Sequence, residues 1–498
     1  MRIVSNKAQD FCLLAIFGAV ALIVGLRPLA DFDFGWHLAG GLWILGHQAL
    51  PQADPFGAEG SRWLCYSWLF EVALAAGYKL GGFRLLQVAQ ALLVLVLVLC
   101  SCVFVRYFSL RSRTASTPRE LLPLLIALIL TSQVWYLRPQ TISLALFMAL
   151  VVLAEAKKLK LLLLLPLTVL WANMHVYWIS VPAVVFLYSV VLPDTSSSSA
   201  ERLRGLGKAL SVFAAGLLTP YGVELFSGMY HYAFNHRIAY GLITEFNHLS
   251  PKQGMYFFAT AVVVVGILFA LPRRLSSVSK PLLVLWLGSL VAALLQIKYL
   301  AFFGVLSAAL VAVCGKPSPI AIPAGGTMVG SKLQGIAVAA FVGVCAAFFE
   351  LPAPLTPRQA ELFHVAADLE TQRVLGGAPE VVFNDFNDGG WLALVFQRSQ
   401  PDEPPYQSFL TSIDGRTLVM GESRLAEYEK IAGQHEGWCR ALQGWDAKFA
   451  LLPKNSPLET VLLSEYQDEN CGGHWERIAT YEFWSTLKYV PNSQHSTA

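Results

Sequence analysis

The feature that most constrains this chain is a series of apolar runs, each nearly as long as a bilayer is thick. A helix needs roughly 20 apolar residues to cross the hydrocarbon layer. About eleven such runs lie near residues 11–28, 85–106, 120–136, 140–156, 161–175, 177–193, 208–224, 254–272, 281–297, 299–314 and 333–350. Only 14% of the 498 residues are charged, against about 25% in soluble domains. The sequence therefore predicts a polytopic α-helical membrane protein.

The last part of the chain has a different pattern. Residues 351–498 alternate short β-like runs with amphipathic helical patterns, and polar turns separate them. The predicted strands are 379–384, 407–413, 447–452 and an antiparallel pair within 474–490, and the predicted helices are 422–432 and 435–443. This pattern is typical of an α/β or α+β domain. We therefore expect a membrane domain over residues 1–350 and a soluble domain over residues 351–498.

The positions of lysine and arginine predict the orientation of the membrane domain, because cytoplasmic connections are enriched in both. One set of alternate connections is basic: Arg2, Lys7, Arg106, Arg111, Arg113, Arg119, Lys157, Lys158, Lys160, Arg202, Arg204, Lys208, Arg273, Arg274, Lys280, Lys316 and Lys332. This set is predicted to be cytoplasmic, which places the N-terminus inside and the C-terminal domain outside. A signal peptide cleaved after Ala30 is the alternative for the first run, and the many later spans favour an uncleaved helix.

The same rule predicts how residues 31–84 are arranged. If the short apolar stretch 68–80, which contains Glu71, crossed the membrane, the arginines at 106–119 would face outside. We therefore expect one long external loop with two interfacial helices, near 36–50 and 67–80. The net charge of +3 gives no indication of a nucleic-acid partner. Cys439 and Cys471, the two cysteines after residue 350, would be free to pair in an oxidising compartment, and the sequence leaves this pairing open.

The motif Asp31-Phe32-Asp33-Phe34-Gly35-Trp36-His37 follows directly after the first span. One interpretation is structural, in which Asp33 caps the following helix. The other is chemical: carboxylates bracketed by aromatic side chains are partly desolvated, which raises their proton affinity and suits them to act as a base. The residue types alone leave both interpretations open.

Further polar side chains lie at the predicted outer ends of the spans. They are Arg138, Gln140, Asn173, His175, Glu245 and Lys298. Ionisable groups near the membrane core are candidates for function. Snorkelling explains Arg138 and Lys298 equally well, and helix–helix hydrogen bonds explain Asn173 and His175. All six lie on the same predicted side of the membrane, so they are able to surround one outward-facing cavity.

Several short motifs together resemble a group of bacterial multi-pass proteins. They are DFDFGWH, GLWILGHQALPQADPF, SWLFEVALAAGYKLGG, YLRPQT, WANMH, TPYG, VFNDFNDGGWL and IDGR. This group is regarded as glycosyltransferases of the GT-C class or GT-C-like proteins. The resemblance implies a lipid-linked sugar donor on a polyprenyl phosphate or diphosphate, and an acidic residue in the first external loop, sometimes with a divalent metal such as Mg²⁺ or Mn²⁺. Asp31 and Asp33 stand where that acid is expected.

The chain departs from the group's pattern at two places. Phe32 and Gly35 replace a proline and a tryptophan, and Ile297-Lys298 stands where paired arginines are common. A lysine still neutralises a phosphate but lacks the planar fork of arginine. The resemblance implies a protein of the bacterial inner membrane.

The hypothesis is a single-displacement transfer on the extracytoplasmic face. Asp33, with Asp31 as second choice, acts as base or metal ligand, and Arg138 and Lys298 stabilise the leaving phosphate. His37, Trp36, Gln140, Asn173, His175 and Glu245 bind the lipid-linked donor or an unidentified glycan, lipid or protein acceptor. Two other classes remain open. A transporter or flippase would use the same polar groups without bond formation, and an assembly scaffold would tolerate changes at Asp31 and Asp33.

Overall fold

The computed structural model describes residues 7–112, 117–193, 197–227, 230, 242–315, 351–373, 378–398, 406–464 and 472–492. The chain forms two compact units, each of which is described by itself. Unit 1 comprises Met1–Arg27, Gln87–Pro220 and Glu245–Ala353, and unit 2 comprises Pro28–Leu86, Tyr221–Thr244 and Pro354–Ala498. This division differs from the boundary near residue 350 that composition predicts, because the first external loop belongs with the C-terminal residues.

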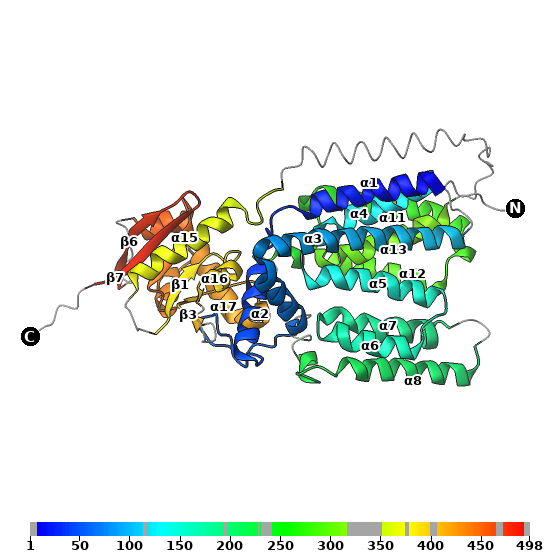
Figure 1. The fold of residues 1–498 in the computed structure, drawn as a ribbon, viewed down its shortest axis with the longest axis horizontal. Helices are drawn as coiled ribbons and strands as arrows, with labels where there is room; N and C mark the ends of the chain where they lie inside the picture. The colour runs from blue at the N-terminus through cyan, green and yellow to red at the C-terminus, as the bar shows by residue number, and fades with distance from the viewer. Residues whose placement is uncertain are drawn as a thin grey trace, which may run out of the picture. The chain divides into compact units, whose positions relative to one another are not determined.

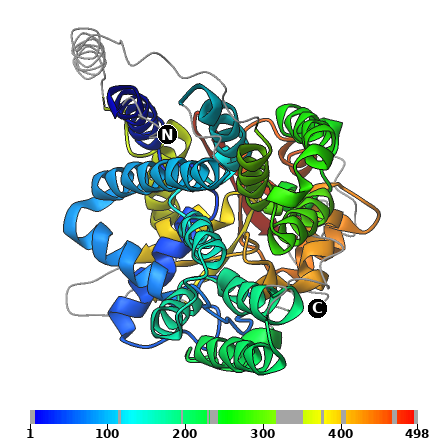
Figure 2. The same ribbon diagram turned by 90° about the vertical axis from the view of Figure 1, so that its right-hand side faces the viewer.

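Unit 1 is helical (Figure 1). Its helices are α1 (Lys7–Gly25), the second part of α3 (Trp68–Arg111), α4 (Thr117–Thr131), α5 (Pro139–Glu155), α6 (Leu161–Ala172), α7 (Ser180–Phe186), α8 (Ser199–Gly216), α11 (Met255–Ala270), α12 (Lys280–Leu295) and α13 (Leu300–Cys314). α13 is the core helix, buried along most of its length and packed against α4, α11 and α12. α6, α7 and α8 pack together as a second group (Figures 1 and 2).

The apolar helices agree with the predicted runs in position. By length and composition, three helices within the described residues are long enough to cross a membrane: Trp68–Arg111, Met255–Arg273 and Ile297–Cys314. Shorter apolar helices of 10–17 residues overlap most of the other predicted runs. The run at 333–350 lies outside the described residues, so the total of about eleven spans stays a prediction.

α3 changes direction at a glycine pair. Gly81 and Gly82 have non-helical dihedral angles, and Gly82 has φ 60° and ψ −160°, a conformation that essentially only glycine adopts. The break lies between the interfacial helix predicted at 67–80 and the span predicted from residue 85. The part before the break belongs to unit 2, and the part from Gln87 onward belongs to unit 1.

Unit 2 contains a mixed five-stranded sheet in the order β4-β1-β5-β7-β6. The strands are β1 (Glu380–Asn384), β4 (Phe409–Thr411), β5 (Phe449–Pro453), β6 (Gly473–Thr480) and β7 (Trp484–Pro491). β4, β1 and β5 are parallel, whereas β5–β7 and β7–β6 are antiparallel. A separate antiparallel pair joins β2 (Gln397–Arg398) and β3 (Tyr406–Gln407). Helices α15 (Pro357–Gln372), α16 (Gly389–Val395), α17 (Thr417–Ala432), α18 (Trp438–Gly444) and α19 (Pro457–Leu462) complete the α/β unit (Figure 1), which confirms the predicted fold class of this part.

The first external loop packs into unit 2 through close backbone contacts. α2 (Phe34–His47) lies against α16, and a Cβ built on Gly35 would be 2.3 Å from the carbonyl oxygen of Gly390. Gly57 forms a parallel bridge with Thr411 of edge strand β4. The loop thus covers an otherwise open sheet edge, as native proteins commonly do. In the same unit, Cys439 is disulfide-bonded, and Cys471 lies outside the described residues.

Candidate functional site

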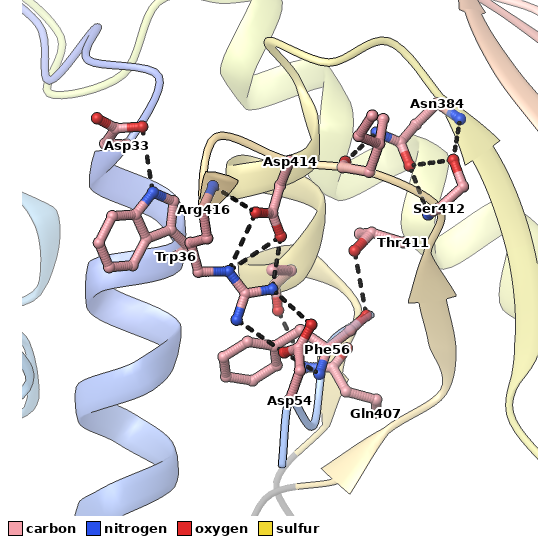
Figure 3. A network of polar contacts seen from close by, with 12 residues as sticks. Asp33, Trp36, Asp54, Phe56, Asn384, Gln407, Thr411, Ser412, Asp414 and Arg416 are labelled. Carbon is pink, nitrogen blue, oxygen red and sulfur yellow. Dashed lines mark hydrogen bonds and ion pairs between the residues drawn. The ribbon is translucent and has the colours of Figure 1, made fainter. Parts of the chain in front are cut away.

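The two aspartates of the first motif have different surroundings within unit 2. Asp31 is 4% exposed, and its carboxylate accepts a hydrogen bond from the backbone N–H of Asp33 at 3.0 Å. Asp33 occupies the N-cap position of α2, yet its side chain makes no capping hydrogen bond. Its carboxylate instead accepts the indole N–H of Trp36 at 3.2 Å and remains partly exposed (Figure 3). The capping interpretation therefore does not account for the Asp33 side chain.

Two C-terminal turns lie directly against this motif. The indole N–H of Trp391 donates to the carbonyl oxygen of Asp31 at 2.9 Å. A Cβ built on Gly415 would be 2.6 Å from the Asp33 carboxylate. The segments 385–390 and 414–416 both contain the hydrogen bond of an Asx turn, from Asn387 N–H to Asp385 and from Arg416 N–H to Asp414. These turns hold the backbone around Asp31 and Asp33.

A buried ion network lies beside them. The Arg416 guanidinium donates to Asp54 at 2.7 and 3.0 Å, and to Asp414 at 2.5–3.1 Å (Figure 3). The three side chains are at most 3% exposed. Two carboxylates thus share one guanidinium, and burial raises the pKa of Asp54 although Arg416 opposes the shift. Burial also opposes the charge on Arg416, but Asp414 and Asp54 outweigh it and raise the arginine's pKa.

Neither Asp54 nor this ion network was predicted. Asp54 lies in the proline-rich stretch of the external loop, where an acid is usually solvated, and Arg416 appears in the sequence only as the last residue of the IDGR motif. The one relevant signal in the sequence was the IDGR motif itself, since an arginine directly after an Asp-Gly turn is able to fold back onto the aspartate. The sequence contains no signal for its second partner.

His37 lies in a buried network. Its Nδ1 is 3.2 Å from the Glu71 carboxylate, which also accepts from Ser67 and Cys65, both at 2.8 Å. Glu71 is 0% exposed. Burial, and then Glu71, raises the pKa of the Cys65 thiol well above its usual range, so this thiol remains a donor. These contacts give His37 a packing role between α2 and the start of α3.

In unit 1, three of the predicted residues come together. Arg138 donates to Glu245 at 2.7 Å, and the Lys298 ammonium lies 4.2 Å from the centre of the Phe246 ring. Arg138 and Lys298 are each 8% exposed. Gln140, the second residue of α5, is half-buried.

The other two predicted residues of unit 1 make contacts typical of helix packing. The Asn173 amide donates to the carbonyl oxygens of Val169 and Leu218 at 2.8 and 2.9 Å. His175 Nδ1 is 2.9 Å from the Ser143 hydroxyl, and its ring packs edge-on against Tyr177. These contacts fit the helix–helix interpretation.

A divalent metal needs several ligand side chains that converge on one point. Within the described part of the chain, no group of three or more His, Cys, Asp or Glu side chains is placed to hold an ion. Asp31 and Asp33 supply two carboxylates. Mg²⁺ is commonly bound through one or two carboxylates and retained waters, so this pair fits Mg²⁺ or Mn²⁺ better than a tetrahedral zinc site.

Comparison with known proteins gives a fold but no family. No family model matches the sequence, and no curated protein matches it. Among solved structures, the oligosaccharyltransferase of Archaeoglobus fulgidus in its apo form gives a TM-score of 0.52 at 11% identity, over 97% of this chain and 74% of that chain. The same enzyme tethered with an acceptor peptide gives 0.50 at 11% identity, over 98% and 74%.

The chain has the fold of an oligosaccharyltransferase. This confirms, at the level of the fold, the GT-C-like architecture that the motifs imply, namely a helical membrane part with a C-terminal sheet domain. At 11% identity the likeness establishes the fold alone.

Proposed function

We propose that the protein is a membrane glycosyltransferase that moves a sugar from a polyprenyl phosphate or diphosphate carrier to an acceptor on the extracytoplasmic face. The fold shared with an oligosaccharyltransferase supports the class of reaction. One set of contacts supports Asp33 as the reacting carboxylate. The Asp33 carboxylate stands at the start of a helix, is not used as a cap, is oriented by Trp36, and stays partly exposed.

The two aspartates have separate roles in this proposal. Asp33 accepts the proton of the acceptor's nucleophilic group as that atom forms a bond to the anomeric carbon. Asp31 is buried and accepts the Asp33 N–H, so it fixes the backbone that presents Asp33. A divalent metal, when bound, would be held by these two carboxylates and would supply positive charge to the reacting groups.

The bond between the anomeric carbon and the phosphate oxygen breaks in the same step. The negative charge that develops on the leaving phosphate needs cationic partners. Arg138 and Lys298 are proposed for this role. Trp36 orients Asp33, and Glu245 orients Arg138 through its 2.7 Å contact. His37, Gln140, Asn173 and His175 support the substrate-binding surfaces through packing.

The proposed location is the inner membrane, with the C-terminal domain outside the cytoplasm. The disulfide at Cys439 supports this orientation, because disulfides persist in oxidising compartments. A fusion of alkaline phosphatase after residue 498 tests it. We expect activity from this fusion and none from a fusion within the basic connection at 157–160.

The function is tested by measuring sugar transfer in membranes with Asp33→Asn and Asp31→Asn. Asp446→Asn is the matched control, since that side chain is 81% exposed and lies in the same unit. We expect Asp33→Asn to lose about a hundredfold or more in rate, the usual effect of removing a catalytic base. Full activity in Asp33→Asn and Asp31→Asn alike contradicts the proposal.

The acceptor is tested separately. The neighbouring oligosaccharyltransferase was solved with an acceptor peptide, so peptide, glycan and lipid acceptors are compared with the same labelled donor. Transfer to one class that depends on Asp33 identifies the acceptor. Donor crossing the bilayer without transfer, at equal rates in the wild type and Asp33→Asn, indicates a transporter instead.

A further inference from the structure

Arg424 is a second buried arginine of unit 2, and it uses fewer of its donors than Arg416 does. Its side chain is 6% exposed. Nε donates to the carbonyl oxygen of Ser412 at 3.1 Å, whereas the buried Nη2 has no hydrogen-bond partner among the described residues. A buried cation is costly unless its donors are paired. The Nη end of the Arg424 guanidinium is therefore able to take a further acceptor.

The carboxylate that pairs with Arg424 comes from Glu59, and the contact is loose. Its oxygen lies 3.3 Å from Nη1, against about 2.7–2.9 Å in a charge-assisted hydrogen bond. The Glu59 side chain is 47% exposed, so solvent screens the ion pair. Burial lowers the pKa of Arg424 to about 10, with Glu59 and then Glu427 opposing the shift. By contrast, Arg416 bonds to two buried carboxylates at 2.5–3.1 Å.

An aromatic ring holds the Arg424 guanidinium in place. Its Cζ lies 3.4 Å from the centre of the Trp445 ring. The indole N–H of Trp445 donates to Glu427 at 2.7 Å, which fixes the ring in turn. Contact with an aromatic face holds an arginine without using the N–H groups along its edge. A planar carboxylate is therefore able to accept from Nη1 and Nη2 side by side.

The loop that carries Glu59 is fixed at its base and open at its tip. The backbone N–H of Ala58 donates to the carbonyl oxygen of Thr411 at 3.0 Å. Gly60, with φ 58°, has no described atom within 4 Å of its Cβ position apart from its chain neighbours. A small cleft beside Glu59 is lined by residues of this loop and by Ser412, Val419 and Met420. The Glu59 side chain can thus move away from Arg424 while the base of the loop stays paired, and another acid can take its place.

We infer that Arg424 and Trp445 form a carboxylate-binding site, which the Glu59 side chain occupies when no ligand is bound. The inference goes beyond sugar transfer and uses none of the residues proposed for that reaction. A small free acid and an acidic side chain of a peptide share this chemistry, and the experiment separates them. Propionate is the smallest matching probe, because it carries the same ethyl carboxylate as a glutamate side chain.

The test measures binding to the full chain in detergent by ligand-observed NMR titration. The probes are propionate, its neutral counterpart propionamide, and the blocked peptides acetyl-Gly-Gly-Glu-Gly-Gly-amide and acetyl-Gly-Gly-Gln-Gly-Gly-amide. Glu59→Gln removes the competing carboxylate, so we expect it to tighten propionate binding by about fivefold, the upper range for release of an exposed ion pair. Arg424→Gln should weaken propionate binding about tenfold or more, since a charge-assisted contact is lost.

The controls change similar charges in the same unit. Glu429→Gln alters an exposed acid on the same helix as Arg424, and Arg440→Gln alters an exposed arginine. Both should leave the affinity for propionate unchanged. The double variant Glu59→Gln/Arg424→Gln should bind no more tightly than Arg424→Gln, because Glu59 acts through Arg424. Thermal unfolding of every variant verifies that it is folded.

Two outcomes identify the source of the carboxylate, and both support the site. A glutamyl peptide that binds at least about tenfold more tightly than propionate identifies an acidic side chain, and equal affinities identify a free acid. The inference is overturned if propionamide binds as tightly as propionate, or if Glu59→Gln leaves propionate binding unchanged. The Glu59 result decides the matter even where an Arg424 variant unfolds, because the Glu59 side chain is half-exposed. Equal tightening by Glu429→Gln would assign the effect to general charge repulsion and would also overturn it.

Discussion

Arg416 and Asp54 lie 362 residues apart in the sequence and are joined by two hydrogen bonds of 2.7 and 3.0 Å. The guanidinium also lies 4.8 Å from the centre of the Trp63 ring and 5.3 Å from that of Phe56. The first external loop is therefore connected to the C-terminal turn through a buried charge. The Arg416–Asp54 ion pair thus joins a loop near the N-terminus to the last third of the chain within unit 2.

Arg416→Lys should destabilise unit 2. Lysine keeps the charge but cannot make fork-shaped bonds to two carboxylates at once. Breaking a buried ion pair typically costs 3–5 kcal/mol, so we expect a loss of about 3 kcal/mol. Pulse proteolysis of the full chain in detergent measures it. Arg440→Lys is the control, because Arg440 is exposed in the same unit. Equal stabilities of the two variants would show that the network is not needed.

Trp36→Phe should lower sugar transfer without unfolding the protein. It removes the indole N–H that donates to Asp33 at 3.2 Å. A hydrogen bond to a charged group contributes about 1.5–3 kcal/mol, so kcat/KM should fall roughly tenfold to a hundredfold. The acidic limb of the rate profile should move to higher pH, because the lost bond favours the charged carboxylate.

The control for this variant is Trp43→Phe on the same helix, where the indole stacks on His47 away from the aspartates. It should leave the rate and the pH profile unchanged. A Trp36→Phe enzyme with the wild-type profile would mean that Trp36 does not orient the carboxylate that reacts.

Much of the fold could be predicted from local patterns. Hydropathy located most helices of unit 1, although α8 (Ser199–Gly216) begins well before the predicted run 208–224, and the alternating runs located β1, β5 and the β6–β7 pair to within a few residues. The positions of the arginines at 106–119 predicted that residues 68–80 do not span the membrane, and the break in α3 at Gly81 and Gly82 agrees with this. These features depend on local patterns of apolar and polar residues, which can be read directly from the sequence.

The site could be predicted only in part. The motif containing Asp31 and Asp33 was conspicuous, but the sequence left open whether the Asp33 side chain caps α2, and in the structure it makes no capping hydrogen bond. Asp54 and Glu71 could not be chosen as buried acids, because their partners Arg416 and His37 are brought in by the fold.

Gly35→Ala should separate α2 from α16. The alanine Cβ would lie 2.3 Å from the carbonyl oxygen of Gly390. This oxygen belongs to the backbone, so it cannot move away by a change of rotamer. We expect a loss of about 1–3 kcal/mol, the usual cost of overpacking. Gly207→Ala is the opposite control: Gly207 lies within α8 with no atom near its Cβ position, so alanine should be neutral or stabilise the helix. Thermal unfolding measures both, and a stable Gly35→Ala would contradict the close packing.

Asp388 is a buried carboxylate at the N-cap of α16, directly before Gly389 and Gly390, the first two residues of that helix. It is 5% exposed, and Arg358 donates to it at 3.1 Å. Burial raises the pKa of Asp388 from 3.8 to about 7, with Asp385 adding to the shift and Arg358 opposing it. In the unfolded chain this carboxyl loses its proton near pH 4, so the two states differ in protonation between about pH 4 and pH 7.

The pH dependence of stability follows with a definite sign. Between these values the folded state holds a proton that the unfolded state has released, so stability falls as the pH rises and levels off above about pH 7. Asp388→Asn is neutral throughout, and asparagine is accepted at an N-cap. From pH 4.5 to pH 8 it should therefore gain on the wild type by up to a few kcal/mol, since one pKa unit corresponds to about 1.4 kcal/mol. The difference in melting temperature between these pH values measures this, with Asp446→Asn as the exposed control. Parallel changes in the wild type and Asp388→Asn would mean that the Asp388 carboxyl does not hold its proton in the folded protein.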